Sequence, residues 1–288
     1  MRHSMNIDID RLQTVPDEEI LSVDLLTEGQ IGPLFTLQTP ARKYFLKTSA
    51  PSERLPTEAR MLEDINKYKI AVPRVYDVSD THLLMAYIPT ETVPKELQER
   101  RAADLLASLH SIGNDERMYG YWYDTTIGPF EQKNEQTQYN WALFFEQMRI
   151  MPMARICYDK GVISKGMLDR LEVLCHTLYR RIDMSKITPS LLHGDLWSGN
   201  ILFNMNEAVL IDPALYFGDR EMELAFILMF NTFGRDFFDT YTRTYPLSED
   251  FHDVKVPLYQ IYPFLVHVAL YGHAYVGGLE ERLERLKV

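Results

Sequence analysis

The texture of the sequence changes near residue 89, and this change constrains the fold more than any other feature. Up to residue 88 the chain runs through short apolar segments separated by glycine, proline and charged residues, which is typical of strands. These segments are S-V-D-L-L, P-L-F-T-L-Q, K-Y-F-L-K and H-L-L-M-A-Y-I. Between the third and the fourth, one stretch instead places Ala59, Leu62 and Ile65 at helical spacing. The pattern predicts a small strand-rich unit that carries one helix.

The remainder of the chain has a mainly helical pattern. One helical face is expected between residues 94 and 110, formed by Leu97, Leu105, Leu106 and Leu109. Further helical stretches cover about 138–160, 164–183, 219–243 and 256–280. A strand-like segment over residues 201–211 is interrupted by N-M-N-E, as in a hairpin. We therefore expect a two-lobed α/β fold, with a β-rich lobe over residues 1–88 and a larger helical lobe over residues 89–288.

Charge, cysteine content and hydropathy exclude several classes of partner. The 288 residues carry a formal net charge of −11, so we expect neither nucleic acid nor an anionic membrane surface as a main partner. The chain contains no run of about 18 apolar residues and does not begin with the apolar segment of a signal peptide. Its two cysteines, Cys157 and Cys175, lack metal-site spacing and indicate reduced thiols. We expect a cytoplasmic monomer.

The stretch H-G-D-L-W-S-G-N at residues 193–200 carries the strongest chemical pattern. Taken alone, an aspartate and an asparagine beside glycine are typical of a turn, because their side chains bind local backbone groups. Here apolar runs on both sides fix the loop to a core, and a hairpin follows that ends at Asp212. The spacing of His193, Asp195 and Asn200 is that of the kinase catalytic loop, H-x-D-x-x-x-x-N, which is followed by a metal-binding aspartate.

Metal-assisted phosphoryl transfer explains why these residue types occur together. The attacking hydroxyl needs an acceptor for its proton, for which we predict Asp195 as a catalytic residue together with His193. The phosphates of ATP need Mg²⁺, a hard cation that prefers oxygen ligands, and Asn200 and Asp212 are the predicted ligands. The sequence therefore predicts a site for ATP and Mg²⁺.

The same chemistry requires a lysine to hold the phosphates and a glutamate to hold the lysine. Lys47 ends a predicted strand and Glu58 begins the predicted helix, in the right order upstream of the loop. Gly29 and Gly32 are weaker candidates for a loop that covers the phosphates. The connector after the last predicted strand, including Met85 and Tyr87, is expected to contact adenine.

The sequence departs from protein kinases at two positions and resembles a family of small-molecule kinases. Trp197 stands where protein kinases have a lysine, and D-P-A stands in place of D-F-G. The chain looks like the aminoglycoside phosphotransferases and choline kinases. Within that group H-G-D-L-W-S-G-N and the segment I-D-P-A-L-Y-F-G-D-R-E-M-E-L-A at 211–225 resemble the fructosamine (ketosamine) kinase family. The resemblance runs from about residue 20 to 280.

This resemblance implies a protein-kinase-like fold and transfer of the γ-phosphate of ATP to the O3 hydroxyl of a ketosamine. The acceptor would be a fructosamine or ribulosamine adduct of a small amine or of a glycated protein, and the unstable 3-phosphate would release the amine, a deglycation activity. Trp197, Asp195, Trp141 and His267 are the residues we expect at the acceptor. Asp219, Arg220 and Glu221 are expected to brace the catalytic loop.

Two alternatives remain open from the sequence. The first is another kinase of the same fold that acts on an aminoglycoside, a choline-like amine or an aminosugar. The second is a nucleotide-binding pseudokinase, against which the presence of all five residues of the predicted ATP site argues. Assays of ADP release with different acceptors would separate them.

Overall fold

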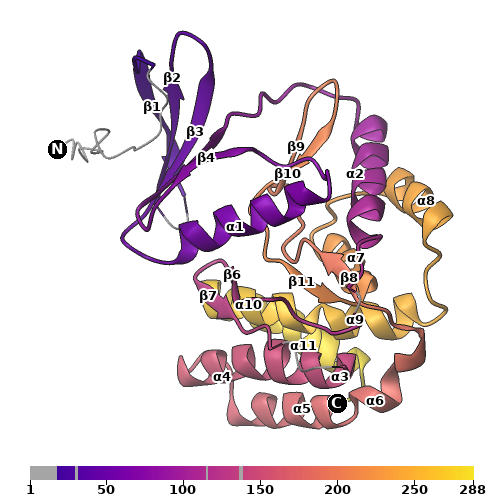
Figure 1. Ribbon diagram of the computed structural model, residues 1–288. Helices are drawn as coiled ribbons and strands as arrows, with labels where there is room; N and C mark the ends of the chain where they lie inside the picture. Colours follow the sequence, from indigo (N-terminus) through magenta and orange to yellow (C-terminus); the bar gives the residue numbers. More distant parts are fainter. Residues whose placement is uncertain (1–17, 30–31, 115, 136–138) are drawn as a thin grey trace.

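The N-terminal part of the molecule is a five-stranded antiparallel sheet with one helix on it. The computed structural model describes residues 18–29, 32–114, 116–135 and 139–288. The sheet has the order β1-β2-β3-β5-β4, and it lies above α1 in the view of Figure 1. Its strands are β1 (Ser22–Glu28), β2 (Pro33–Gln38), β3 (Lys43–Thr48), β4 (Val75–Val78) and β5 (His82–Ala86). The four predicted strands are present, and β4 was not predicted.

Alternation along the strands gives this sheet two apolar faces. Leu46 on β3 and Leu84 on β5 pack on one face with Phe35, Leu37 and Tyr44. Leu83 and Met85 point to the other face, where they meet the predicted helix, α1 (Arg54–Lys67). The helix therefore covers one side of the sheet.

Helix α1 also contacts the rest of the molecule. Its Met61 and Ile65 belong to the large core. The hydroxyl groups of Tyr121 and Tyr123 donate to Asp64 Oδ2 at 3.1 and 2.7 Å. One helix thus packs against the sheet and against the larger lobe, as the central position of α1 in Figure 1 shows.

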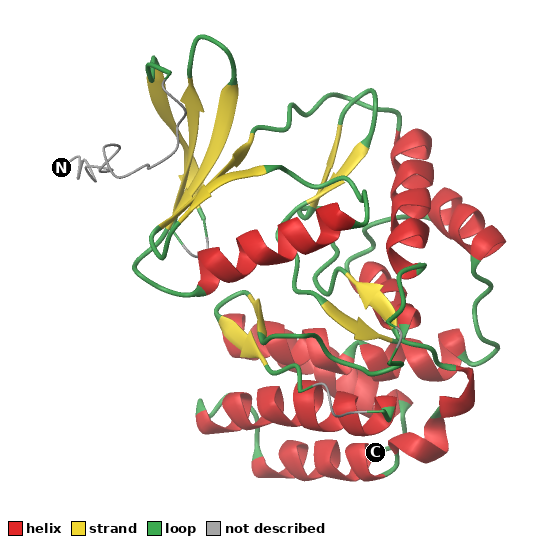
Figure 2. Cartoon of the chain, in the orientation of Figure 1, coloured by secondary structure: helices red, strands yellow, loops and turns green. Residues whose placement is uncertain are grey.

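The rest of the described chain is mainly helical (Figure 2). Its longer helices are α2 (Lys95–His110), α4 (Met151–Asp159), α5 (Lys165–His176), α7 (Arg220–Met229), α8 (Arg235–Thr244), α10 (Ile261–Tyr271) and α11 (Val276–Arg285). Shorter helical segments are α3 (Trp141–Phe144), η2 (Phe145–Ile150), α6 (Leu178–Arg181), η3 (Met184–Lys186), η4 (Phe251–Lys255), α9 (Val256–Tyr259) and η5 (Gly272–Tyr275). No helix in the described part of the chain is long and apolar enough to cross a membrane.

Several helices are shorter than the stretches over which the sequence predicted them. The stretch 219–243 is two helices, because the chain turns between Met229 and Arg235. The stretch 256–280 is broken at Gly272, whose φ of 73° ends α10 in a conformation that favours glycine. On α2 the buried face includes Glu99 and His110, whereas Leu97 and Leu105 are only half-buried.

Three two-stranded ribbons complete the larger lobe. The predicted hairpin over 201–211 is confirmed as β9 (Ile201–Phe203) and β10 (Ala208–Leu210). The other ribbons pair β6 (Thr125–Ile127) with β7 (Phe130–Gln132), and β8 (Ser190–Leu192) with β11 (Tyr216–Gly218). Together β8 and β9 flank the H-G-D-L-W-S-G-N segment.

Candidate active site

The catalytic loop, residues 193–200, is held by close backbone contact with the segment after β10. Ala214 N donates to His193 O at 2.7 Å. Gly194 has a φ of 85°, and a Cβ at this position would overlap the carbonyl oxygen of Ala214. Glycine is required here for both reasons. The loop and the strand end that carries Asp212 are therefore fixed next to each other.

Asp195 and Asn200 lie side by side in this loop. Asn200 Nδ2 donates to the backbone oxygen of Asp195 at 2.7 Å and to its Oδ2 at 3.1 Å. Burial, with a further contribution from the negative charge of Asp212, raises the pKa of Asp195 to about 7, although the bond from Asn200 opposes this shift. A carboxylate with such a pKa is a stronger proton acceptor than an ordinary aspartate.

Asp212 joins the loop to the predicted lysine–glutamate pair. Lys47 on β3 is buried, and its Nζ lies 2.6 Å from Glu58 Oε1 and contacts Asp212 Oδ1 directly. Burial opposes the charge of Lys47, but the two carboxylates outweigh it and raise its pKa, so the lysine stays protonated. Asp212 has a φ of 54°, a left-handed conformation that is uncommon outside glycine and asparagine and is found at functional sites.

These residues line one cleft between the sheet and the larger lobe. The cleft has a volume of about 530 Å³ and is bordered by Lys47, Glu58, Asp195, Asn200 and Asp212. Gly29, Gly32 and Trp197 also line it. The structure thus brings together eight of the residues proposed from the sequence.

Arg54 is a cleft residue that the sequence did not single out. It lies one turn before Glu58 on α1 and adds a second cationic side chain to the cleft wall. Its Nη2 donates to Pro129 O at 3.2 Å. Residues four positions apart are neighbours on a helix surface, so the position of Arg54 four residues before Glu58 is the sequence pattern that would have indicated it as a cleft residue.

The donor set fits a hard divalent cation. Asp212 offers a carboxylate that is 43% exposed, and Asn200 offers an amide oxygen whose nitrogen is held by Asp195. Oxygen donors of this kind suit Mg²⁺, which takes few protein ligands and keeps places for phosphate and water. Among the described residues no group of three or more His, Cys, Asp or Glu side chains is arranged as a metal site.

His193 does not reach the cleft, contrary to its predicted catalytic role. Its side chain is completely buried. Nε2 lies 2.8 Å from Ile211 O, and Nδ1 accepts from the backbone of Asp195. Burial lowers its pKa, although Glu223 opposes the shift, so the imidazole is neutral with its proton on Nε2. His193 ties the loop to the end of β10 and positions Asp195 relative to Asp212.

Glu223 is the main brace of the catalytic loop, and the sequence did not reveal it. Its carboxylate accepts from His193 N at 3.1 Å and from Gly194 N at 2.7 Å. Behind it lies His110 on α2, with Nε2 at 3.0 Å from the carboxylate and Nδ1 at 2.6 Å from the hydroxyl of Tyr241. Burial favours the neutral carboxyl, but these hydrogen bonds and charges outweigh it and lower the pKa of Glu223.

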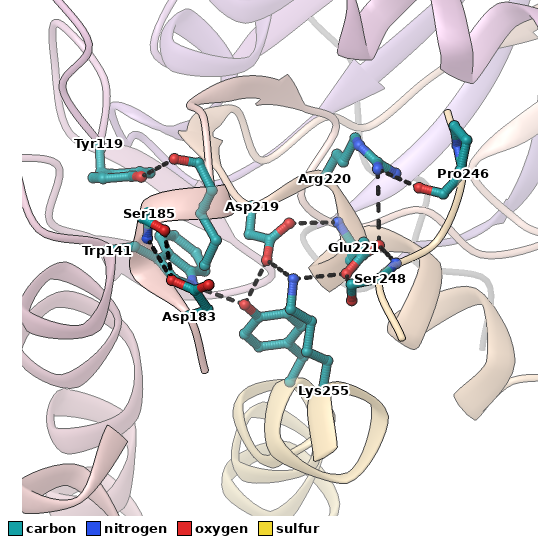
Figure 3. A network of polar contacts seen from close by, with 12 residues as sticks. Tyr119, Trp141, Asp183, Ser185, Asp219, Arg220, Glu221, Pro246, Ser248 and Lys255 are labelled. Carbon is teal, nitrogen blue, oxygen red and sulfur yellow. Dashed lines mark hydrogen bonds and ion pairs between the residues drawn. The ribbon is translucent and has the colours of Figure 1, made fainter. Parts of the chain in front are cut away.

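The predicted brace, Asp219 and Glu221, binds Lys255 and residues near it (Figure 3). Lys255 Nζ lies 2.9 Å from Asp219 Oδ2 and 2.7 Å from Glu221 Oε2. Ser248 donates to Glu221, and Tyr259 donates to Asp219 at 2.6 Å. These bonds fix the start of α7 to η4 and α9. The expectation that Asp219 and Glu221 brace the catalytic loop directly was therefore wrong.

Arg220, the remaining member of the predicted brace, contacts the segment after α8. Its Nη2 donates to the carbonyl oxygen of Pro246 at 2.7 Å. Its guanidinium also lies 5.3 Å from the ring centroid of Tyr245. Arg220 therefore fastens α7 to the segment after α8.

The structure places two further side chains that were predicted at the site, those of Trp141 and Met85, away from the cleft. Trp141 is 1% exposed, and its indole donates to Tyr259 at 2.9 Å, so it is a core residue and not an acceptor contact. Met85 is buried against α1, which leaves only its backbone for adenine. Tyr87, beyond β5, has its ring 4.5 Å from Lys43 Nζ. The adenine contact through this connector stays a prediction.

Trp197 is exposed, with its indole over the backbone of Gly199. A Cβ on Gly199 would overlap the ring, so the glycine allows the indole to lie flat against the loop. The indole nevertheless keeps 41% of its surface exposed beside the cleft. His267 lies on α10, half-buried, with Nδ1 at 2.8 Å from Pro263 O.

Solved structures identify the fold class. An ADP-bound aminoglycoside phosphotransferase superposes with a TM-score of 0.64 at 20% identity, covering 93% of this chain and 93% of its own. The chain therefore has the two-lobed, protein-kinase-like fold of the aminoglycoside phosphotransferases. A candidate fructosamine-3-kinase from Thermobifida fusca superposes with a TM-score of 0.84 at 28% identity, covering 94% of this chain and 95% of that one.

Sequence comparison narrows the class to one family. The sequence pattern of the fructosamine kinase family matches residues 6–288. A probable ketoamine kinase from Lactiplantibacillus plantarum is 30% identical over 278 residues, which is 94% of this chain and 96% of the relative. The chain belongs to the fructosamine kinase family, and it is an ATP-dependent phosphotransferase.

Proposed function

We propose that the protein transfers the γ-phosphoryl group of ATP to the O3 hydroxyl of a ketosamine, a sugar joined to an amine. The observation that carries the proposal is the assembly of Lys47, Glu58, Asp195, Asn200 and Asp212 in one cleft. The family match over residues 6–288 supports the ketosamine acceptor. In this proposal residues 1–88 bind the nucleotide, and residues 89–288 supply the reacting groups and the acceptor pocket.

The reaction follows from the positions of these side chains. Asp195 accepts the proton as the O3–H bond breaks and O3 forms a bond to the γ-phosphorus. The bond from that phosphorus to the oxygen of ADP breaks at the same time, and ADP leaves with the electron pair. Lys47, which two carboxylates keep protonated, holds the phosphates and offsets their charge.

Asn200 and Asp212 would hold Mg²⁺ together with the nucleotide. When bound there, the ion supplies positive charge to the phosphate oxygens during transfer. Asn200 also fixes the carboxylate of Asp195 through its amide nitrogen. The same asparagine would thus align the base and the metal.

A panel of acceptors tests the proposed substrate class. ADP release is measured with fructose and ribulose adducts of lysine, with a glycated protein, with unmodified lysine as the matched control, and with an aminoglycoside. We expect turnover of the adducts and none of lysine itself. Turnover of the aminoglycoside alone would replace the proposal with the other small-molecule kinase, and no Mg²⁺-dependent ATP consumption with any acceptor would favour a pseudokinase.

The substitution Asp195→Asn tests the proposed base. It removes the proton acceptor while keeping the size of the side chain, so we expect kcat to fall by about 10²–10⁴-fold, the usual range for a lost general base. Nucleotide binding, measured by calorimetry, should be largely kept, because Lys47 remains in place. Wild-type kcat in this variant would exclude Asp195 as the base.

A further inference from the structure

A row of aromatic rings leads from the catalytic loop to the C-terminal helices, and the proposed mechanism does not use most of it. We call it the aromatic surface; it consists of Trp197, Phe230, His267, Tyr271 and Tyr275. Ring centroids are 6.5 Å apart from Trp197 to Phe230 and 5.0 Å from Phe230 to His267. His267 lies 5.7 Å from Tyr271 and 5.0 Å from Tyr275. The five rings form one continuous surface.

Three elements bring these rings together. Phe230 is the C-cap residue of α7. It follows Glu223, which binds the catalytic loop, by two helical turns. His267 and Tyr271 stand one turn apart on α10. Because Gly272 ends that helix, the short η5 turns the chain so that Tyr275 comes within 5.7 Å of Tyr271. The surface therefore begins beside the proposed base and ends at the outside of the larger lobe.

The rings are accessible to a ligand. Trp197 is 41% exposed and Tyr271 is 50% exposed, while the other three are half-buried. No lysine or arginine of the described residues lies over the ring faces of Trp197, Phe230 or Tyr275. Aromatic faces attract cations, most strongly for Trp. These faces are therefore open to a cationic group.

His267 adds a hydrogen-bond acceptor to the aromatic surface. Its Nδ1 lies 2.8 Å from the carbonyl oxygen of Pro263, so Nδ1 carries the proton and donates. Burial lowers the pKa of His267, which keeps the ring neutral at neutral pH. Nε2 is then an acceptor, and it has no hydrogen-bond partner within the described part of the chain. An ammonium N–H is a suitable donor for it.

The covalent structure of a ketosamine places its protonated amine close to this surface. The reacting hydroxyl is on C3, the carbonyl is on C2 and the amine is on C1, so only four bonds separate O3 from the nitrogen. When O3 lies at Asp195, the nitrogen must lie near it, and Trp197 follows Asp195 by two residues. The alkylated amine is protonated at neutral pH, as an unperturbed lysine amine is.

Building on the proposed function, we propose that the aromatic surface binds the amine half of the acceptor. The ammonium lies against Trp197 and Phe230, and the substituent on nitrogen extends past His267 to Tyr271 and Tyr275. The sugar remains in the cleft with its O3 at Asp195. Because the outer end of the surface is half-exposed, the substituent can continue into solvent, as the side chain of a glycated lysine in a peptide would.

Acceptors that share a sugar and differ in the amine test this assignment. The set is the fructose adducts of methylamine, benzylamine and the ε-amine of Nα-acetyl-lysine, together with the ribulose adducts of the same amines. The variants are Phe230→Leu and Tyr271→Ala. Tyr179→Ala on α6 is the matched control, since Tyr179 is 58% exposed and belongs to none of these elements. kcat/KM is measured by ADP release, and KM for ATP serves as a check on folding.

We expect Tyr271→Ala to lower the preference for the benzylamine and lysine adducts over the methylamine adduct about three- to tenfold, the size expected for a lost aromatic contact. Phe230→Leu removes a contact with the ammonium that all the adducts share, so it should lower kcat/KM for every adduct by a similar factor. The preference between fructose and ribulose should not change, and neither should either preference in Tyr179→Ala. If wild-type enzyme turns over the adducts but Tyr271→Ala leaves the amine preference as it is, Phe230→Leu leaves kcat/KM as it is, or either variant alters the sugar preference, the inference is overturned while the proposed function stands. If wild-type enzyme turns over none of the adducts, the proposed function fails and this inference with it.

Discussion

Two buried lysines in this protein have the same immediate chemistry and different surroundings. Lys47 lies between Glu58 and Asp212, and Lys255 lies between Asp219 and Glu221. Around Lys47 one carboxylate, that of Asp212, is 43% exposed and opens on the cleft. Around Lys255 both carboxylates are at most 6% exposed.

The difference shows that access, and not the set of charged groups, separates a reactive cluster from a structural one. A lysine that faces a cleft can exchange a carboxylate contact for a phosphate. A lysine that is sealed from solvent can only hold helices together, and its removal would leave its two carboxylates buried without a cation. Four changes test this distinction, from the largest expected effect to the smallest.

Removing divalent cations affects only the open cluster. With EDTA present we expect ADP release to fall more than about 10³-fold, because the charge on the transferring phosphate is no longer offset. Added Mg²⁺ should restore it. The midpoint of thermal unfolding should stay the same, since the Lys255 cluster contains no open oxygen ligand. Full activity in EDTA would contradict the assignment of Asn200 and Asp212.

The substitution Lys47→Met removes the cation from the cleft. We expect kcat/KM for ATP to fall by about 10²–10³-fold, as for other lost electrostatic contacts to a transition state. The free energy of unfolding should change little, because Asp212 can be hydrated and burial already raises the pKa of Glu58 to about 7, which favours its neutral form. Steady-state kinetics and urea unfolding measure the two effects.

The matched substitution Lys255→Met should lower stability and leave catalysis nearly unchanged. It leaves Asp219 and Glu221 buried without a cation, so the free energy of unfolding should fall by about 3–5 kcal/mol. The molecules that remain folded should keep a kcat close to that of the wild type, since neither carboxylate contacts the catalytic loop. A variant that is stable but inactive would show that the two clusters are coupled.

Glu223 and Glu221 offer a smaller comparison on one helix. Glu223→Gln replaces one of two acceptor oxygens with a donor, so either His193 N or Gly194 N loses its partner and the loop shifts. We expect kcat to fall by about 10–100-fold with little change in KM for ATP, as for a small displacement of a reacting group. Glu221→Gln should lower stability and leave kcat unchanged. Equal effects on kcat would mean that both residues brace the loop.

Residues that act through a short local pattern could be predicted from the sequence. Asp195, Asn200 and Asp212 stand at fixed spacing around a hairpin. Lys47 lies near the end of β3 and Glu58 near the start of α1, so their meeting in one cleft followed from the order of the chain. Four strands of the sheet, β1, β2, β3 and β5, could be predicted in the same way from their alternating patterns, whereas β4 could not.

Residues that act through distant contacts could not be predicted. Glu223 binds a loop some thirty positions earlier in the sequence, and His110 binds Glu223 from another helix. The periodicity of a helix or strand does not indicate contacts of this kind. Glu99 is a buried charge on α2, although it does not belong to the leucine face that the sequence predicted. Ribbons such as β8 and β11 are three residues long, too short for an alternating pattern to be distinct.

The anchoring of α1 has a consequence for control of the enzyme. In kinases whose glutamate helix swings, whatever moves that helix turns the enzyme on or off. Here the helix that carries Glu58 is fastened to the larger lobe at Asp64, and Arg60 lies 3.7 Å from the ring centroid of Tyr123. The larger lobe therefore restrains any movement of α1 that would separate Glu58 from Lys47.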